Sequence, residues 1–395
     1  MSEWQECRLG EIAEIQTGPF GSQLKNKQYI TGGTPVVTVE HISNFRINNF
    51  SYPSVTDEDK NRLSRYLLNE GDIIFTRVGS VDLSAFVKPH QQGWMFSSRM
   101  LRVRPEKKVD ARFLSYFFQQ KPFRDYVLSI AVGATMPSIN TEILKSLPIS
   151  YPDLSEQKAI ASVLSSLDDK IDLLHRQNKT LEAMAETLFR QWFVEEAGED
   201  WEEALITELF EVRDGTHDSP KQSIVGRPLI TSKHILDGQL DIANAYLISE
   251  NDFNKINQRS KVDTGDILFS MIGTIGLIYF EQSLLIDYAI KNIGLFKTSQ
   301  NPDWAIFTFL WLKSPIGRQF IDEHKSGSTQ EYVALGSMRS IVFQKPPIEI
   351  LKKFNKLVSS YFAKIKLNHT QIHTLGTLRN TLLPKLMSVE VRVAV

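Results

Sequence analysis

Few residues in this sequence have the types and spacing that catalysis or metal binding requires. His369 and His373 lie four residues apart, which places two imidazoles on one face of a helix, where they can hold Zn²⁺. No glutamate follows the first histidine at the position a zinc hydrolase needs, so we interpret the pair as a solvated face. His217 and His234 have no second ligand at metal spacing. The sequence therefore predicts no metal site.

Two other segments contain parts of known active-site motifs. Residues 301–304, Asn-Pro-Asp-Trp, lack the second proline of the amino-methyltransferase motif, and no glycine-rich cofactor turn precedes them. Residues 152–158 hold the Pro-Asp and Glu-x-Lys halves of a nuclease site, but the halves are crowded at the start of an expected helix, where capping explains them better. A phosphate-binding loop is also missing. We therefore expect no catalytic residue in this chain and no cofactor bound by it.

Polar, glycine-rich loops are better candidates for function. Residues 16–22 and 213–219 are such loops, and so are residues 77–80 and 271–274. Loops on a rigid scaffold commonly carry binding residues, and these can present amides, hydroxyls and charged side chains to DNA. Arginine suits guanine, and asparagine or glutamine suits adenine. A simple hairpin turn is the alternative interpretation of each loop.

The loops recur because the sequence contains one unit twice. Residues 71–76, Gly-Asp-Ile-Ile-Phe-Thr, return 194 positions later as residues 265–270, Gly-Asp-Ile-Leu-Phe-Ser. Small loop insertions explain why the offset drifts elsewhere, and an ordered series of matches is not expected by chance. The other matches include Trp4 with Trp201, Gly18 with Gly215, Pro35 with Pro228, His41 with His234, Gly79 with Gly273, Gly133 with Gly327, Thr135 with Thr329, and Pro152 with Pro346.

Most of each unit indicates strands and turns, whereas its last 40 or so residues predict a long helix. Residues 36–39, 72–76 and 101–104 predict strands, and aromatic-rich residues 113–120 and 307–313 predict short helices. In the last 40 or so residues of each unit, apolar residues alternate at spacings of four and three, which is a heptad seam. Before the first helix, Asp153 and Glu156 have the spacing of a capping box. Each seam is roughly 50 Å long at about 1.5 Å per residue. The first seam is Ile160, Leu164, Leu167, Ile171, Leu174, Asn178, Leu181, Ala185, Leu188 and Trp192, and the second is Phe354, Val358, Tyr361, Ile365, Asn368, Ile372, Leu375, Arg379, Leu382 and Leu386.

Each seam must be buried, and the other helix is the nearest partner. Residues 151–200 contain 5 basic and 11 acidic residues, whereas residues 348–395 contain 8 and 2, so opposite charges favour the pairing. An antiparallel pairing from midpoint to midpoint places Asn178 opposite Asn368, and a lone buried asparagine fixes the register of such a seam. We hypothesise that these two residues pair. The alternative is that each faces solvent.

Composition limits the class of protein. The 395 residues are 42% hydrophobic and 23% charged, which is ordinary for a globular chain of two or three domains. The formal net charge of −1 argues against a strongly basic DNA binder. The charge is unevenly distributed, since residues 1–150 contain 18 basic and 15 acidic residues, whereas residues 201–347 contain 14 basic and 18 acidic residues. No segment approaches the roughly 18 to 20 apolar residues of a membrane helix. Because the single cysteine, Cys7, allows no internal disulfide and no leader is visible at Met1, we expect a cytoplasmic protein.

In the order of these features, the sequence resembles the specificity subunit of type I restriction–modification systems. The resemblance covers the whole chain and is carried by the two-unit layout, the repeated Gly-Asp strands, and Gly133-Ala134-Thr135 with Gly327-Ser328-Thr329. The first unit boundary, residues 147–157, is the most similar to the family. The second boundary, residues 346–351, lacks the Glu-Gln pair, so the match there depends on the heptads.

The resemblance implies an α+β fold: two homologous β-rich α/β target-recognition domains separated by two long antiparallel coiled-coil helices, in a pseudo-twofold internal repeat. The expected bounds are 1–152 and 198–346 for the domains, 153–197 and 347–388 for the helices, and 389–395 for a tail. Each domain would bind one half of a bipartite, asymmetric site in double-stranded DNA. The helices would set the gap and dock methyltransferase subunits, usually two, which restriction subunits join. S-adenosylmethionine, ATP and Mg²⁺ would belong to those partners.

Candidate DNA-binding residues follow from the loops of both units. The loops differ between the units, with Arg77 against Met271 and Phe20 against His217, which predicts unlike half-sites. The alternative function is a coiled-coil interaction scaffold that does not itself read DNA, and the near-neutral charge is its best support. The candidates are Gln16, Thr17, Gly18, Phe20, Ser22, Arg77, Ser80, Arg99 and Thr135 in the first unit, and Asp214, Gly215, Thr216, His217, Lys233, Thr274, Lys291 and Thr329 in the second.

Overall fold

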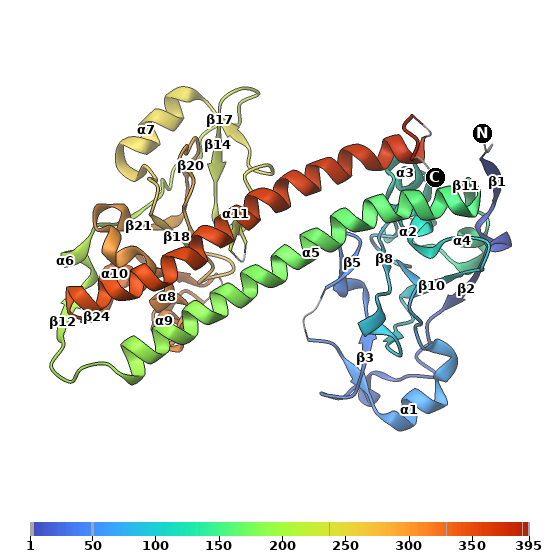
Figure 1. The fold of residues 1–395 in the computed structure, drawn as a ribbon, viewed down its shortest axis with the longest axis horizontal. Helices are drawn as coiled ribbons and strands as arrows, with labels where there is room; N and C mark the ends of the chain where they lie inside the picture. The colour runs from blue at the N-terminus through green and yellow to red at the C-terminus, as the bar shows by residue number, and fades with distance from the viewer. Residues whose placement is uncertain are drawn as a thin grey trace. The chain divides into compact units, whose positions relative to one another are not determined.

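The chain forms two compact units, each with its own sheets. The computed structural model describes residues 4–48, 51–133, 135–236, 238–328, 330–388 and 390–393. Unit 1 contains residues 1–172 and 372–395, and unit 2 contains residues 173–371. The divisions fall inside two long helices, α5 (Leu154–Arg190) and α11 (Ile348–Met387), so each unit contains part of both (Figure 1).

The centre of unit 1 is a four-stranded antiparallel sheet whose strand β7 (Ile73–Thr76) is buried on both faces. The order of the sheet is β2 (Ala13–Thr17), β10 (Met100–Pro105), β7 and β8 (Ser84–Phe86). Because side chains alternate along a strand, Ile73 and Phe75 join one apolar cluster and Ile74 joins the other. The first cluster includes α2 (Ala111–Gln119) and α3 (Lys121–Ile130). Burial on both faces explains why this strand is a continuous apolar run.

Smaller sheets complete unit 1. The strand predicted at residues 36–39 lies at residues 34–37 instead, because residues 39–41 form a 3-10 turn in which the Thr38 amide donates to Nδ1 of His41 at 3.1 Å. The remaining elements are the sheet β6 (Ser54–Val55), β3 (Thr34–Val37) and β9 (Met95–Phe96), the hairpin β4 (Ile42–Ser43) and β5 (Arg46–Ile47), the pair β1 (Gln5–Arg8) and β11 (Pro148–Tyr151), and the helices α1 (Asp57–Arg62) and α4 (Thr141–Lys145).

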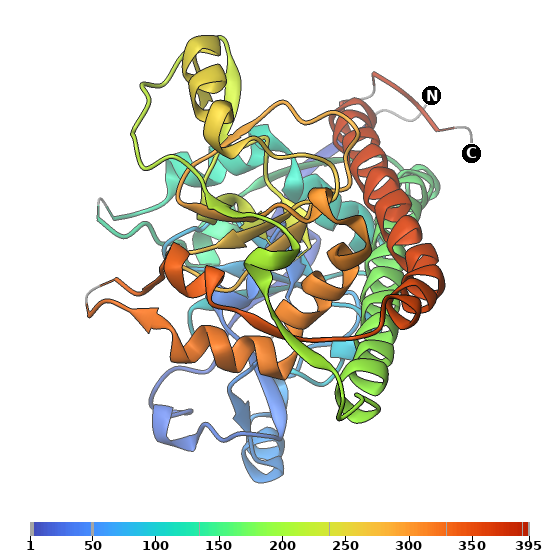
Figure 2. The same cartoon turned by 90° about the vertical axis from the view of Figure 1, so that its left-hand side faces the viewer.

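Unit 2 repeats this architecture (Figure 2), so the predicted fold class is confirmed. Its four-stranded sheet is β13 (Val212–Asp214), β21 (Ile293–Phe296), β18 (Ile267–Ser270) and β19 (Ile278–Phe280), and its three-stranded sheet is β17 (Leu247–Ile248), β14 (Arg227–Ile230) and β20 (Ala289–Ile290). Two-stranded pairs are β15 (Ile235–Leu236) with β16 (Gln239–Leu240), β12 (Glu202–Leu205) with β24 (Val342–Lys345), and β22 (Lys325–Ser326) with β23 (Tyr332–Val333). The helices are α6 (Ile206–Leu209), α7 (Glu250–Ser260), α8 (Ala305–Lys313), α9 (Pro315–Glu323) and α10 (Leu335–Arg339).

The repeated Gly-Asp pair has the same structural role in each unit. Asp72 is buried, accepts the Asn69 amide at 2.8 Å and holds the Arg104 guanidinium with two bonds of 2.7 Å. In unit 2, Asp266 is buried, accepts the Asp263 amide at 2.7 Å and pairs with the buried Lys297. A buried carboxylate needs such partners because its desolvation is otherwise costly. The motif therefore closes the turn before the central strand and is scaffold.

The two long helices pair through the predicted seams and lie side by side in Figures 1 and 2. The Glu156 amide donates to Oδ1 of Asp153 at 3.0 Å, which is one of the two bonds of the expected capping box. In unit 1, Ile160 and Leu164 share an apolar cluster with Leu382 and Leu386, and in unit 2, Ala185 and Phe189 share one with Phe354 and Val358. The pairing is antiparallel within each unit. Across the described ranges, no helix combines the length and apolarity needed to cross a membrane.

The two seam asparagines are buried and bonded to each other. Nδ2 of Asn368 donates to Oδ1 of Asn178 at 2.7 Å, which confirms the predicted pairing and excludes the alternative that they face solvent. The other amide nitrogen, Nδ2 of Asn178, and Oδ1 of Asn368 are buried without a hydrogen-bond partner among the described residues. The pair is therefore only half satisfied, which is costly for stability. That it fixes the register remains a prediction.

The acidic residues of α5 mostly pair with the globular part of their own unit, contrary to the expectation that opposite charges join the two helices. Within the described residues, one ion pair joins α5 to α11, Asp168 with Arg379 at 3.0 Å. Asp172 contacts Arg46 and Lys88, and Lys313 contacts Glu182 at 2.6 Å. The charges of α5 therefore attach each sheet region to its helix, whereas apolar contacts carry the pairing of the helices.

Candidate nucleic-acid interface

In unit 1, the predicted loops meet at one edge of the four-stranded sheet. β2 and β7 end, and β10 begins, at this edge, since Leu101 pairs with Thr17 and Met100 with Thr76. The Arg77 amide donates to the carbonyl of Arg99 at 2.8 Å. The sheet therefore brings together residues 16–22, 77–80 and 97–99, which are far apart in the sequence.

The segment that carries Thr135 joins the same edge. The Gly79 amide donates to the Pro137 carbonyl at 2.8 Å, and the Ile139 amide donates to the Arg77 carbonyl at 3.0 Å. Thr135 and Met136 are exposed beside this connection. Four segments thus form one surface in unit 1, which we call loop cluster 1: residues 16–22, 77–80, 97–99 and 135–139.

Arg77 lies at the centre of loop cluster 1. Its Nη1 donates to the Ser98 carbonyl at 3.2 Å, and its guanidinium lies 5.5 Å from the centre of the Phe20 ring, within the range of a cation–π contact. Phe20 is 51% exposed, so its other surface is open to solvent. These contacts hold a half-buried guanidinium beside an exposed aromatic ring. The guanidinium can donate hydrogen bonds to the edge of a base, and the ring can stack on the face of a base.

Loop cluster 1 also contains buried polar atoms without partners. Oε1 of Gln16, Nε of Arg77 and Oγ of Ser97 have no hydrogen-bond partner among the described residues. An unsatisfied buried polar group costs about 1–3 kcal/mol, so native structures hold few of them. Three such atoms therefore lie just beneath the surface of loop cluster 1.

In unit 2, the equivalent edge carries a different set of side chains. Nε2 of His217 lies 2.9 Å from Oδ2 of Asp214, and its Nδ1 lies 2.8 Å from Oδ1 of Asn292. Nζ of Lys291 donates to Oγ of Ser219 at 2.6 Å. The amide of Thr216 donates to the Ile290 carbonyl at 3.0 Å, which fastens the loop to β20. We call residues 213–219, 231–234 and 290–292 loop cluster 2.

Gly18 and Gly215 occupy equivalent positions where no side chain fits. A Cβ atom on Gly18 would lie 2.2 Å from the Ser97 carbonyl oxygen, and one on Gly215 would lie 2.5 Å from the Ile290 carbonyl oxygen. Both glycines are buried, and so is Asp214. Their burial indicates that these three residues hold the loops and the neighbouring side chains in place, and that they also contact DNA remains a prediction.

The remaining candidates reach the surface to different degrees. Lys233 belongs to the turn of loop cluster 2 that Ser232 joins to residues 290–292 through a 3.1 Å bond to the Asn292 carbonyl, whereas Thr274 lies in the turn after β18. Thr329 lies outside the described residues. Phe20, Ser22, Ser80, Arg99, Thr135, His217, Lys233 and Thr274 are exposed, and Gln16, Thr17, Arg77, Thr216 and Lys291 are half-buried.

Sequence reasoning missed two cations of α7 that border loop cluster 2. Arg259 donates through Nη2 to Oδ1 of Asp214, and Nζ of Lys255 lies 3.8 Å from Oδ2 of Asp218. The Arg259 side chain is 61% exposed although its partner is buried. No local motif marks these residues, because the contact joins positions 45 residues apart. A basic pair four residues apart on a helix was the available signal.

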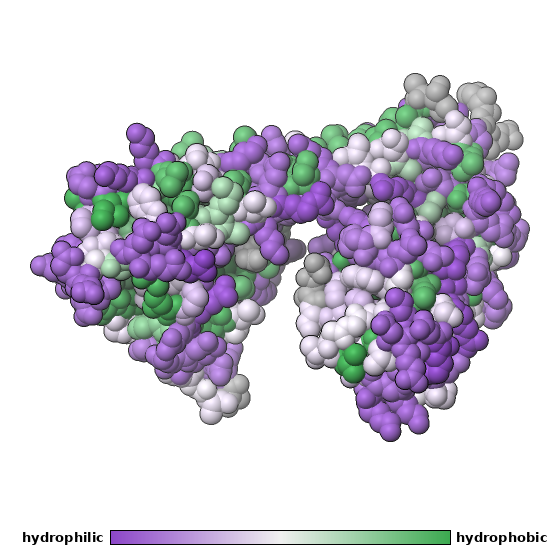
Figure 3. Space-filling model, turned by 60° about the horizontal axis from the view of Figure 1, so that its bottom comes forward, coloured by the Kyte–Doolittle hydropathy of each residue, from purple (hydrophilic) through white to green (hydrophobic). Residues whose placement is uncertain are grey.

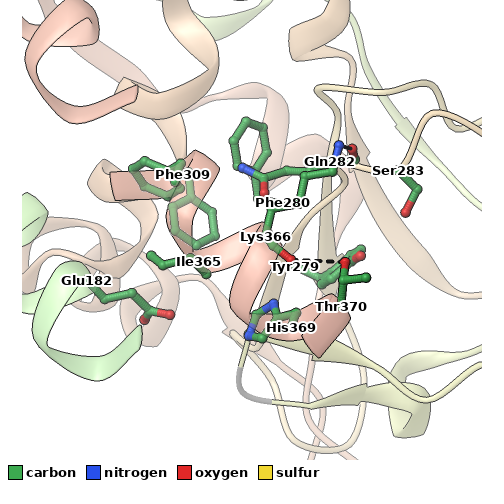
Figure 4. Close-up of a pocket in the computed structure, with 12 residues that line it drawn as sticks. Glu182, Tyr279, Phe280, Gln282, Ser283, Phe309, Ile365, Lys366, His369 and Thr370 are labelled. Atoms are coloured by element: carbon green, nitrogen blue, oxygen red, sulfur yellow. Dashed lines mark hydrogen bonds between the residues drawn. The ribbon is translucent and has the colours of Figure 1, made fainter. Parts of the chain in front are cut away.

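A cavity in unit 2 lies apart from loop cluster 2. It has a volume of about 150 Å³, and Figure 4 shows Phe309, Phe280, Ile365 and His369 lining it. Burial lowers the pKa of His369. Lys366 donates to the Gln282 carbonyl, which joins α11 to the loop after β19. None of the lining residues belongs to loop cluster 2, so the cavity marks the junction of helix and sheet.

Comparisons with known proteins agree with this architecture. The chain is 25% identical over 427 residues to the type I restriction enzyme MjaIX specificity subunit of Methanocaldococcus jannaschii, covering 99% of this chain and 94% of that protein. It is 25% identical over 291 residues to the EcoKI specificity subunit of Escherichia coli K12, covering 66% and 60% of the two chains. The crystal structure of a type I restriction–modification S subunit from M. genitalium has the same fold, with a TM-score of 0.59 at 15% identity over 98% of this chain and 96% of that one.

One family model matches this chain twice, once in each half of the repeat. Residues 1–183 and residues 198–376 match the type I restriction modification DNA specificity domain, so the two segments contain the equivalent sheets. Together the segments cover most of the chain. This chain therefore belongs to the family of type I restriction–modification DNA specificity proteins.

Proposed function

We propose that this chain is the non-catalytic subunit that selects DNA sequence for a type I restriction–modification complex, with each unit reading one half of a bipartite, asymmetric site. The observation that carries the proposal is the pair of loop clusters at equivalent edges of a repeated sheet. Both clusters stand on the same scaffold, the buried Asp72 and Asp266 and the close-packed Gly18 and Gly215. Because the two units share the same scaffold but carry different loop side chains, each can recognise a different half-site.

The chemistry of the two clusters supports unlike half-sites. Loop cluster 1 offers an arginine beside an exposed phenylalanine, and loop cluster 2 offers a histidine held between a carboxylate and an amide. Arginine is the commonest guanine reader, whereas asparagine suits adenine. Figure 3 shows a mainly hydrophilic surface with small apolar patches over both units, which suits a polar, hydrated DNA interface.

The long helices support a role in assembly. Although their seams are buried, several apolar side chains of α5 and α11 point outward, including Met184 at 44% exposed and Leu367 at 50%. An apolar stripe on a paired helix is a surface that another helix can cover. We propose that methyltransferase subunits, two in number, dock there, that restriction subunits join them, and that these partners bind S-adenosylmethionine, ATP and Mg²⁺.

Mapping of methylated sites tests this function. The chain is expressed with a methyltransferase subunit of its system in cells that lack other methylation, and modified positions are sequenced. The expected result is one bipartite motif with two unlike halves and a fixed gap. Loss of all modification when this chain alone is omitted completes the test. Modification that is independent of this chain would instead favour a scaffold that does not read DNA.

A further inference from the structure

We propose that Arg259 is a guanine-reading residue of unit 2 and that the buried Asp214 is the residue that positions it. This inference rests on the proposed function, since it names a residue that determines one half-site. Arg259 is in the last turn of α7, and Asp214 ends β13, the edge strand of the four-stranded sheet. Their contact joins a helix end to the sheet edge where loop cluster 2 lies.

The anchoring leaves much of the arginine available. Within the described contacts, only Nη2 of its guanidinium is engaged, with Oδ1 of Asp214. The side chain is 61% exposed, whereas that of Asp214 is 6% exposed. Guanine offers O6 and N7 in the major groove, and arginine meets them with two N–H groups. A guanidinium fixed at one nitrogen and open at the others has lost part of its rotamer freedom before binding.

Asp214 holds more than one reader in place. Its other oxygen, Oδ2, lies 2.9 Å from Nε2 of His217, and Nη1 of Arg213 donates to the Arg259 carbonyl at 3.1 Å. A carboxylate buried this deeply must be paired, so Arg259 and His217 stabilise it and are oriented by it in return. A change at Asp214 is therefore expected to act through both side chains.

The surroundings have the charge that DNA attracts. Lys255, one turn before Arg259, and Lys291 border the same loop. Residues 201–347 contain 14 basic and 18 acidic residues, so the unit is acidic as a whole. Arg259 and Lys255 are paired with the loop carboxylates Asp214 and Asp218, whereas Lys291 bonds to the Ser219 hydroxyl. These exposed and half-buried cations around residues 213–219 are available to phosphate groups beside Arg259.

Unit 1 has no equivalent of this pair. Thr17 stands where Asp214 stands, because Gly18 matches Gly215. Arg65 corresponds to Arg259 by the repeat offset of 194, but its guanidinium donates to the Tyr66 hydroxyl at 2.6 Å and lies over the Tyr66 ring. Unit 1 therefore lacks the Asp–Arg pair at the equivalent positions. A residue that makes the two half-sites different must itself differ between the units, and Arg259 meets this condition.

The test measures methylation rates on a library of sites by the complex of this chain with its methyltransferase subunit. Arg259→Ala is expected to reduce discrimination at one guanine of one half-site by about 5- to 150-fold and to leave the other half unchanged. Arg259→Lys retains the charge but not the two-pronged contact, so it is expected to lose the same discrimination. Asp214→Asn is expected to weaken preference at that position and at neighbouring ones.

Lys255→Ala is the matched control, since it removes a nearby cation of the same helix. It is expected to lower rates on all sequences alike. The inference is overturned if Arg259→Ala lowers rates uniformly on all sequences, because that result assigns Arg259 to phosphate. Full preference retained by Arg259→Lys would also contradict it, since the two-pronged guanidinium contact would then not be what selects the base. Thermal unfolding of each variant identifies any loss of folding, and Arg259→Lys keeps the ion pair with Asp214. A wild-type complex without a bipartite motif would refute the proposed function itself.

Discussion

Gly18 and Gly215 show how single residues maintain the loop clusters. A Cβ atom on Gly18 would overlap the Ser97 carbonyl at 2.2 Å, and backbone atoms cannot give way as a flexible side chain does. We therefore expect Gly18→Ala to reduce the free energy of unfolding by about 1–3 kcal/mol, as overpacking does, and to impair recognition of one half-site. Urea unfolding and site mapping measure the two effects. Gly21→Ala is the control, since its Cβ would meet nothing within 4 Å, and equal effects of the two variants would contradict this account.

His234 makes the stability of unit 2 depend on pH. The side chain is 2% exposed, and burial lowers its pKa below the ordinary value of 6.5. The unfolded state therefore takes up the proton first, so stability is full above pH 6.5 and is lost as the pH falls below it. Urea midpoints between about pH 8 and 5 should fall less steeply for His234→Asn than for the wild-type chain. An equal slope in His234→Asn and the wild-type chain would contradict this account.

At the scale of elements, the half-satisfied asparagine pair is expected to cost stability. Asn178→Leu leaves the buried Asn368 amide with only its 3.5 Å bond to Oε1 of Gln177, so we expect a loss of about 1–3 kcal/mol in the free energy of unfolding. The double variant, with Asn368→Leu added, replaces the pair by apolar contact and should recover most of that loss or exceed the wild-type value. A double-mutant cycle from urea unfolding measures the coupling. Strictly additive single effects would show that the pair does not act as a unit.

The same elements show what could be predicted from sequence. The heptads predicted the two helices and the bond between Asn178 and Asn368, because a seam fixes its facing residues by simple periodicity. The apolar runs predicted the central strands to within a residue or two. The partners of the α5 carboxylates and the contact of Arg259 with Asp214 were not predictable, since they depend on tertiary packing. Likewise, the loops predicted a binding surface, but burial alone showed that Gly18, Asp214 and Gly215 support it.

At the scale of the whole molecule, duplication with divergence predicts a site whose halves can be altered one at a time. The described contacts of Arg77 all lie in loop cluster 1, with Ser98, Arg99, Phe20 and Ile139. Arg77→Ala should therefore reduce discrimination in one half-site by about 5- to 150-fold and leave the other half unchanged. Methylation of a randomised site library by the complete complex measures both halves in one experiment.

The matched control for Arg77 is Lys107→Ala, an exposed cation that follows the far end of β10. It should leave both halves unchanged, because that end of the strand is opposite the edge that carries loop cluster 1. An equal loss in both halves after Arg77→Ala would show that the units do not read DNA independently. A palindromic wild-type motif would contradict unlike halves, since loop cluster 1 presents an arginine beside a phenylalanine whereas loop cluster 2 presents a histidine beside the anchored Arg259.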